Sequence, residues 1–234
     1  MPPKIKGIAF DIFGTVVDWF GSIVEIGSAA SGTVDWKSFA IGWLKAYRTR
    51  VEQVRKRERP WAPLDTLLNE GFAELSQQFD LSGLSPSALR ELATAWHRLK
   101  PWSDVTRALE RLRERFRIGA LSNANTLLLV DMAKAAKLPW DCIASAEMPK
   151  KYKPEPEVYV LACESLGDQR DEVLYVASHK WDLQAGQALG MRSAYIPRPL
   201  ELGDGGPPPE DPSPDPSFDF FAKDFLDLAQ QLLA

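Results

Sequence analysis

The chain has 234 residues, of which 45% are hydrophobic, and a formal net charge of −4. This length is enough for one or two domains with a substantial core, and the hydrophobic fraction is ordinary for a globular protein. The negative charge argues against a nucleic-acid-binding protein, and no apolar run approaches the roughly 18 residues that a membrane-spanning helix needs. The first residues lack a signal-peptide profile, and Cys142 and Cys163 stand in no C-x-x-C or metal-ligand spacing. We therefore expect a cytoplasmic protein with reduced thiols and with no nucleic-acid or membrane partner.

A short strand is predicted at the start of the chain. The apolar run from Ile5 to Phe10 is too short for a helix and is typical of a buried strand in a parallel sheet. Asp11, Gly14 and Thr15 follow directly, and the end of such a strand opens into the crevice where α/β folds bind ligands. A carboxylate in that position is costly unless it has partners or a function, and Gly14 permits a tight turn beside it.

Residues 19–100 have a helical pattern without a convincing strand. Apolar residues spaced by three and four predict a long helix over 35–57, with Asp35 as its N-cap, and a second helix over 64–79. Ser85-Pro86 begins a third helix, with serine at the cap and proline at the first helical position. We interpret the basic residues around the first helix as a solvated face rather than an anion site; they are Arg48, Arg50, Arg55, Lys56, Arg57 and Arg59.

Strands and helices alternate from Pro101 onward, which predicts a parallel, doubly wound α/β sheet. The predicted strands are 117–122, 143–146, 173–178 and 192–196, and the predicted helices are 105–116, 125–136, 156–166 and 183–189. The segment 202–217 is rich in proline, glycine and aspartate and is interpreted as a mobile surface loop that does not pack. A last edge strand over 218–222 and a helix over 225–233 follow. The core is therefore split into 1–18 and 101–234, with the helical segment 19–100 inserted.

Polar candidates follow three of the predicted strands. Asp11 comes after the first strand, Ser122 and Asn123 end and follow the second, and Ser178 and His179 follow a third. Because the carboxyl ends of parallel strands lie at one edge of the sheet, we expect these side chains to converge.

Four stretches, in order, resemble the motifs of the haloacid dehalogenase superfamily. They are FDIFGT around Asp11, Leu121-Ser122-Asn123, Lys153-Pro154, and the stretch from Val176 to Asp182. The resemblance covers nearly the whole chain and is closest to the type II, L-2-haloacid dehalogenases. It implies a Rossmann-like core with an all-helical cap at 19–100. It also implies a hydrolase that needs no metal or cofactor and converts short 2-haloalkanoic acids to 2-hydroxy acids and halide.

In this resemblance Asp11 is the nucleophile, which forms an aspartyl ester that water later cleaves. Lys153, in K-P-x-P-x-x-Y, keeps Asp11 ionised, and Asp182 either pairs with that lysine, polarises a water or is only an acid at a helix N-terminus. His179 donates to the ester carbonyl, handles the hydrolytic water or is a structural residue. We count Ser178 with these catalytic residues and assign substrate binding to Thr15, Ser122, Asn123, Tyr159, Phe13, Trp43 and Arg48.

Phe13 separates two kinds of chemistry. In the phosphatase branch of the superfamily a second aspartate stands at this position, acts as general acid and base, and has Mg²⁺ alongside. Phe13 supplies no acid, and Asp182 stands alone in the fourth motif, whereas a hard divalent cation requires several carboxylate oxygens. The sequence therefore favours metal-free attack at carbon, with a Mg²⁺-dependent phosphatase as the alternative.

Three positions depart from the L-2-haloacid dehalogenases. Those enzymes carry an arginine directly after a tryptophan in the first cap helix, where it helps to bind the halide. Alignment on Trp43 puts Leu44 at this position, with Arg48 one turn further on. Ala177 and His179 stand where the family often has serine and asparagine. These departures leave the identity of the substrate open. A degenerate, non-catalytic binding protein is a second alternative function. The oligomeric state is also open, with a homodimer as one candidate. His97, which follows a tryptophan in the helical segment, is interpreted as structural.

Overall fold

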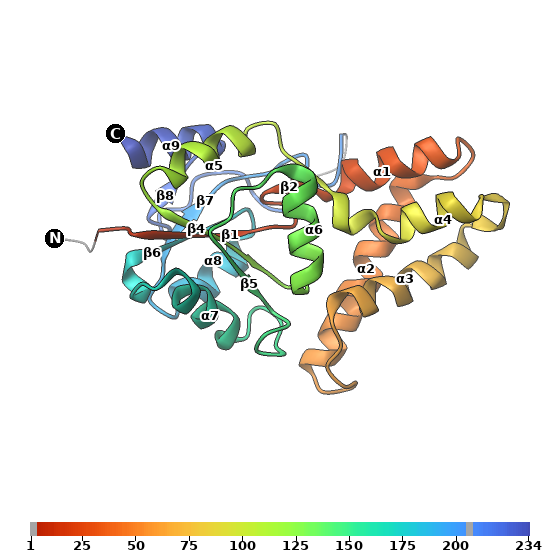
Figure 1. Ribbon diagram of the computed structural model, residues 1–234, viewed down its shortest axis with the longest axis horizontal. Coiled ribbons are helices and arrows are strands. Elements are labelled where there is room, and N and C mark those ends of the chain that lie inside the picture. Colours follow the sequence, from red (N-terminus) through yellow and green to blue (C-terminus); the bar gives the residue numbers. More distant parts are fainter. Residues whose placement is uncertain (1–3, 205–207) are drawn as a thin grey trace.

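The computed structural model describes residues 4–204 and 208–234. A six-stranded parallel sheet with the order β5-β4-β1-β6-β7-β8 lies at its centre (Figure 1). The strands are β1 (Gly7–Asp11), β4 (Arg117–Ser122), β5 (Cys142–Ser145), β6 (Val173–Ala177), β7 (Arg192–Tyr195) and β8 (Phe220–Phe221). All residues of β1 are buried, and both neighbouring strands pair with it in parallel. The strand that carries Asp11 is therefore the middle of the core.

Helices cover both faces of this sheet. They are α5 (Val105–Arg113), α6 (Thr126–Ala136), α7 (Pro156–Leu166), α8 (Lys180–Gln187) and α9 (Phe225–Leu233), with a 3₁₀ helix η3 (Arg170–Glu172) before β6. In Figure 1, α5 and α9 lie together on one side of the strands and α7 lies on the other. The prediction of a doubly wound, Rossmann-like α/β fold with a helical insertion is confirmed.

The inserted helices lie together at one end of the sheet (Figure 1). They are α1 (Trp19–Ala30), α2 (Trp36–Arg55), α3 (Leu64–Gln78), η1 (Leu81–Gly83), α4 (Pro86–Ala93) and η2 (Ala95–Arg98). The predicted caps are present, since the Asp35 carboxylate accepts from the Ser38 N–H and the Ser85 hydroxyl accepts from the Ala88 N–H. Helix α1 is absent from the sequence prediction because its glycines weaken the helical signal. One of them, Gly27, lets the Trp36 ring approach so closely that a Cβ there would overlap it.

The two connections between the sheet and the helical segment pair with each other. Strand β2 (Val17–Asp18) and strand β3 (Lys100–Pro101) form a short antiparallel ladder. The Lys100 N–H also donates to the Ser22 hydroxyl, 2.8 Å away. We propose a division into a core of residues 1–18 and 101–234 and a cap of residues 19–100, because both crossings of the chain coincide at this ladder.

The segment 202–217 packs more than its composition predicts. Residues 205–207 lie outside the described part of the chain. Beyond them, Glu210 accepts from the backbone N–H of Lys180 at 2.7 Å, and the carbonyl of Asp211 accepts from the Tyr195 hydroxyl at 2.9 Å. The interpretation that this segment does not pack is wrong for these residues, because a proline-rich chain keeps its carbonyl and carboxylate acceptors.

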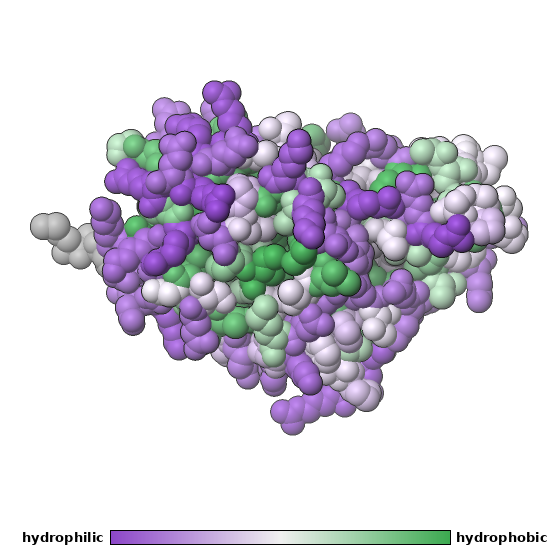
Figure 2. Space-filling view, viewed as in Figure 1, coloured by the Kyte–Doolittle hydropathy of each residue, from purple (hydrophilic) through white to green (hydrophobic). Residues whose placement is uncertain are grey.

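The surface is mostly polar on the face shown in Figure 2, with an apolar area near the middle, over the region of α6. Leu127, in the first turn of α6, has 62% of its surface exposed. Within the described residues no helix is long and apolar enough to cross a membrane.

Candidate active site

The polar residues at the strand ends meet between the sheet and the inserted helices. Asp11 ends β1, Ser122 ends β4, and His179 follows β6. A cavity of about 300 Å³ lies at this edge. Its walls are Asp11, Phe13, Ser122, Asn123, Lys153, His179, Trp181, Asp182 and Glu201 from the core, and Trp19, Leu44, Tyr47, Arg48, Val51, Glu52 and Arg55 from the helical segment. This volume is at the lower end of the range for ligand sites, so the cavity fits a small molecule.

Lys153 is the centre of a buried ion network. Its Nζ lies 2.8 Å from Asp11 Oδ1, 2.9 Å from Asp182 Oδ2 and 2.6 Å from the Tyr175 hydroxyl oxygen. These partners account for all three N–H donors of a lysine. Burial by itself would lower the pKa of Lys153, but the carboxylates of Asp11 and Asp182 outweigh it and raise the pKa above its usual value. The ammonium is therefore charged and fixed in position.

Asp11 is held as a carboxylate. Burial would raise the pKa of Asp11, but the charges and hydrogen bonds of Lys153 and His179 outweigh it and hold the pKa well below its usual range. The Thr15 hydroxyl donates to Asp11 Oδ2 at 2.7 Å. Only 8% of the Asp11 surface is exposed, and that part faces the cavity. The arrangement presents an ionised carboxylate to whatever the cavity holds, as covalent catalysis by aspartate requires.

Asp182 pairs with Lys153. Its Oδ2 also accepts from the Tyr175 hydroxyl, and its Oδ1 accepts from the Tyr159 hydroxyl, both at 2.6 Å. Burial and the nearby Asp182 charge raise the pKa of both tyrosines well above the usual value, so both stay protonated donors. The geometry thus favours the first of the roles considered for Asp182, and it places Tyr159 against Asp182. Tyr175 was missed because a tyrosine inside a predicted strand gives no sign of which groups its hydroxyl meets.

His179 lies between two carboxylates. Its Nε2 is 3.0 Å from Glu201 Oε2, and its Nδ1 is 3.6 Å from Asp11 Oδ2. Glu201 is only 2% exposed, and its Oε1 accepts from the Trp19 indole N–H at 3.1 Å. Burial lowers the pKa of His179, but Glu201 and Asp11 together raise it to about 10. The ring is therefore an imidazolium at neutral pH.

Sequence reasoning missed Glu201. It stands in the connection after β7, next to the proline- and glycine-rich segment, and no periodic pattern marks it. The only available signal was an acidic residue shortly after a predicted strand end.

The remaining polar candidates of the core fall into two groups. Thr15 is fully buried, and its hydroxyl accepts from the Ser178 backbone N–H at 2.9 Å while it donates to Asp11. Through these hydrogen bonds, Thr15 and Ser178 fix the position of the loop that follows Asp11. Ser122 and Asn123 line the cavity, and the Asn123 side-chain oxygen accepts from the Lys153 backbone N–H at 2.8 Å.

Of the substrate-binding residues predicted in the helical segment, one lies away from the cavity and one lines it. Trp43 lies in the interior of the helical segment, where its indole N–H donates to the Leu68 carbonyl at 2.8 Å. This position differs from the predicted contact with substrate. The next residue, Leu44, does line the cavity, as do Arg48 and Phe13. An apolar side chain therefore stands at the place where the sequence comparison expected a halide-binding arginine.

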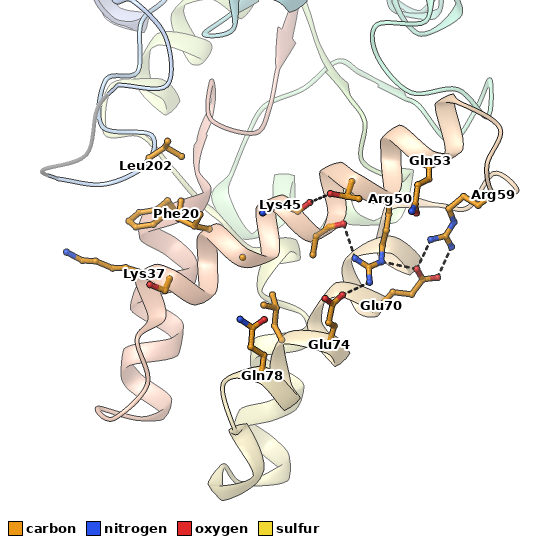
Figure 3. A pocket seen from close by; sticks show the side chains of 16 residues that line it. Phe20, Lys37, Lys45, Arg50, Gln53, Arg59, Glu70, Glu74, Gln78 and Leu202 are labelled. Carbon is orange, nitrogen blue, oxygen red and sulfur yellow. Dashed lines mark hydrogen bonds and ion pairs between the residues drawn. The ribbon is translucent and has the colours of Figure 1, made fainter.

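The basic residues of α2 and the following loop do not form one solvated face. Arg48 and Arg55 line the cavity. Arg50 and Arg59 instead point toward Glu70, as Figure 3 shows, with Nη1 of Arg59 2.8 Å from a Glu70 oxygen. These pairs border a wider hollow of about 1,020 Å³ on the other side of α2. Both carboxylates in its lining, Glu70 and Glu74, are paired with arginines, and none corresponds to Asp11, so the smaller cavity is the better candidate site.

The described residues do not fit a divalent metal. Within 4–204 and 208–234, no group of three or more His, Cys, Asp or Glu side chains is placed to hold an ion. Asp11 and Asp182 both face the ammonium of Lys153, and position 13 is phenylalanine. A hard cation such as Mg²⁺ requires more free oxygen ligands than these residues provide.

Comparisons with known proteins agree with this site. The sequence model of the haloacid dehalogenase-like hydrolases matches residues 5–190, and the chain belongs to this family. Haloacetate dehalogenase H-2 of Moraxella sp. (strain B) is 31% identical over 83% of this chain and 87% of its own length. (S)-2-haloacid dehalogenase 4A of Burkholderia cepacia is 27% identical over 89% of this chain and 87% of its own length.

Two crystal structures are similar over the whole fold. The L-2-haloacid dehalogenase PA0810 has a TM-score of 0.90 and 37% identity, and the match covers 97% of this chain and 99% of that one. The defluorinating L-2-haloacid dehalogenase Rha0230 has a TM-score of 0.90 and 36% identity over 100% of both chains. The resemblance inferred from the four motifs is confirmed.

Proposed function

We propose that this protein is a hydrolytic 2-haloacid dehalogenase, a hydrolase that acts on carbon–halide bonds. The observation that carries the proposal is an ionised Asp11, held by Lys153 at the wall of a small cavity, with phenylalanine at position 13. The activities named for the similar proteins support the same reaction class.

In the first step the Asp11 carboxylate attacks the halogen-bearing carbon. A carbon–oxygen bond forms, the carbon–halogen bond breaks, and the halide leaves with the electron pair. Lys153 and Thr15 hold the carboxylate in position for this attack. Ser122 and Asn123 are the neutral donors available to the carboxylate of the substrate.

In the second step water attacks Cγ of the aspartyl ester. The ester bond breaks, the 2-hydroxy acid is released and Asp11 is restored. The cavity of about 300 Å³, with Phe13, Leu44 and Val51 in its walls, suits acids of two or three carbons. We propose haloacetates and 2-halopropionates as the substrate class, and no step requires a metal.

The test is halide release from chloro-, bromo- and fluoroacetate and from 2-chloropropionate, measured with excess EDTA and repeated for Asp11→Asn. We expect EDTA to leave the rate of the wild type unchanged, and the amide variant to fold and release no halide. Strict dependence on Mg²⁺, with phosphate release from a small phosphorylated metabolite, would favour the alternative phosphatase. A folded wild type that binds haloacids without turnover would favour the non-catalytic alternative.

We further propose a homodimer. The exposed Leu127 and the apolar area over the region of α6 in Figure 2 support a protein contact on this face. Sedimentation velocity of the wild type and of Leu127→Lys tests it, because a dimer held by this face dissociates in the variant.

A further inference from the structure

Asp182 and His179 both lie close to the nucleophile, but they differ in their capacity to accept a proton. A carboxylate has about four lone-pair sites, and Asp182 already accepts hydrogen bonds from Lys153, Tyr159 and Tyr175. Asp182 also borders the cavity, but it is only 1% exposed against 7% for His179, so its remaining site has less access to water. His179 lines the cavity, and its Nδ1 faces Asp11. His179 is therefore the better placed acceptor for a proton from the hydrolytic water.

We propose that the charge of Asp11 controls His179: the ring is a cation in the resting enzyme and becomes the general base once Asp11 is esterified, with Glu201 as its positioning residue. This inference rests on the proposed dehalogenase function and adds the identity and the timing of the base.

The charges around His179 explain the change. Glu201 faces Nε2 and Asp11 faces Nδ1, while Lys153 pairs with the other oxygen of Asp11, and Arg48 and Arg55 line the same cavity. With both carboxylates ionised, the pKa of His179 is raised to about 10 although burial opposes it. Ester formation removes the charge of Asp11, so that of the two carboxylates only Glu201 still favours the cation, against burial and the Lys153 charge. The pKa of His179 then falls and the ring can lose its proton.

Glu201 also selects the tautomer. A carboxylate only accepts, so the neutral ring keeps its proton on Nε2 and donates it to Glu201, and the lone pair is left on Nδ1. That lone pair faces the Asp11 ester. The Trp19 indole N–H holds the other Glu201 oxygen at 3.1 Å, so the carboxylate cannot rotate away without losing this bond.

The protons balance over the two steps. In the first step the new carbon–oxygen bond displaces halide, and the proton of His179 Nδ1 leaves the site. In the second step Nδ1 takes a proton from water as the water oxygen attacks Cγ. When the bond from Cγ to the substrate oxygen breaks, one proton of the water is on the hydroxy acid and the other is on His179. Asp11 is again a carboxylate and the net products are 2-hydroxy acid, halide and one proton.

The position of His179 argues against a role as the halide acceptor. A halide displaced by Asp11 leaves on the side of the carbon opposite to the attacking oxygen. His179 instead lies beside the Asp11 carboxylate, with Nδ1 3.6 Å from Oδ2. The ring is thus next to the ester that the first step creates.

The test separates the two steps by rapid quench with excess 2-chloropropionate. In His179→Asn and Glu201→Gln we expect a burst of one halide per enzyme, followed by turnover about 100-fold slower, the range in which general-base catalysis contributes. Mass spectrometry should then show the ester accumulating on the peptide that contains Asp11. Glu201→Asp, which keeps the charge, should recover part of the rate. Tyr195→Phe removes a partly buried hydrogen bond, to the Asp211 carbonyl, and is the matched control without a burst.

Several outcomes would overturn the inference. Loss of the burst, with no ester in either variant, would mean that His179 acts in the first step. Unchanged ester hydrolysis in both variants would mean that another group, such as Asp182, is the base. If Glu201→Gln does not fold, His179→Asn and Glu201→Asp carry the same test, and the wild-type ester hydrolysis rate should depend on a pKa below 10 that His179→Asn removes. A wild type that releases no halide from any haloacid contradicts the proposed function itself, which is a distinguishable result.

Discussion

Lys153→Met removes the ammonium of the buried network while it keeps most of the length of the side chain. The wild-type Nζ is 2.8 Å from Asp11 and 2.9 Å from Asp182, and the lysine side chain is only 2% exposed. The variant leaves two buried carboxylates without their common counter-ion, and the loss of one partner from a buried ion pair costs about 3–5 kcal/mol. Because each kcal/mol shifts Tm by about 2–4 °C in a chain of this size, we expect Tm to fall by roughly 6–20 °C at pH 7.

The loss of stability in Lys153→Met depends on pH in a defined direction. The pKa of Asp11 is depressed in the folded wild type, so its contribution to the free energy of unfolding is present above the unfolded pKa of about 3.9. That contribution is lost as the pH falls through the depressed folded value. In Lys153→Met the pKa of Asp11 rises, and this carboxylate takes up its proton at higher pH than in the wild type. The difference in Tm between the two proteins should therefore be largest at neutral pH and smaller at pH 4.

Thermal unfolding followed by circular dichroism at pH 7 and pH 4 measures this difference. The matched control is Lys153→Met with Asp182→Asn, which removes one of the two unpaired charges and should recover part of the lost stability. An unchanged Tm at pH 7, or an equal loss at both pH values, would refute the assignment of the stability to this ion network.

Three further outcomes are expected. A single turnover in heavy-oxygen water should label Asp11, and a label that enters the product directly would rule out the ester. Leu44→Arg should raise kcat on 2-chloropropionate about ten- to hundred-fold. A hydrogen bond to a charged group, here from the new arginine to the departing halide, contributes about 1.5–3 kcal/mol, which corresponds to this change in rate. If Arg48 already supplies the cation, Arg48→Ala should instead cripple the wild type and Leu44→Arg should add nothing. His97 contacts both Asp65 and Asp131, and these carboxylates raise its pKa. The contribution of His97 to the free energy of unfolding is therefore fully present below the unfolded pKa of ~6.5, and it is lost as the pH rises through the raised folded pKa. His97→Gln should therefore lower Tm more at pH 6 than at pH 9, and an equal loss would exclude this ion pair.

Local patterns in the sequence predicted most of the fold. The strand over 117–122 and the helices over 156–166 and 225–233 have their observed bounds, since apolar spacing reports the buried face and proline marks a helix start. Helix α1 was not predicted because Gly21 and Gly27 suit close packing against neighbours rather than an isolated helix. Its stability comes from tertiary contacts, which a single stretch of sequence does not display.

The convergence of strand ends was also predictable. Parallel strands that alternate with helices must bring Asp11, Ser122 and His179 to one edge, whatever the details of packing. The order of the motifs added Lys153 as the partner of Asp11, and the structure has Nζ 2.8 Å from the carboxylate. Phenylalanine at position 13 likewise indicated, from the sequence alone, that the second acid of the phosphatase branch is missing.

The tertiary structure alone decided which groups share the buried space around those residues. Tyr175 and Glu201 are central to the site, yet neither stands in a motif, and Glu201 binds Trp19 across 182 positions of the chain. The same is true of Trp43, whose indole faces Leu68 rather than the cavity. The charge of His179 depends on burial and on the distances to two carboxylates, and both are set by packing between remote segments. Sequence periodicity determines which face of an element is buried, but the partner of a buried polar group is determined only when the elements come together.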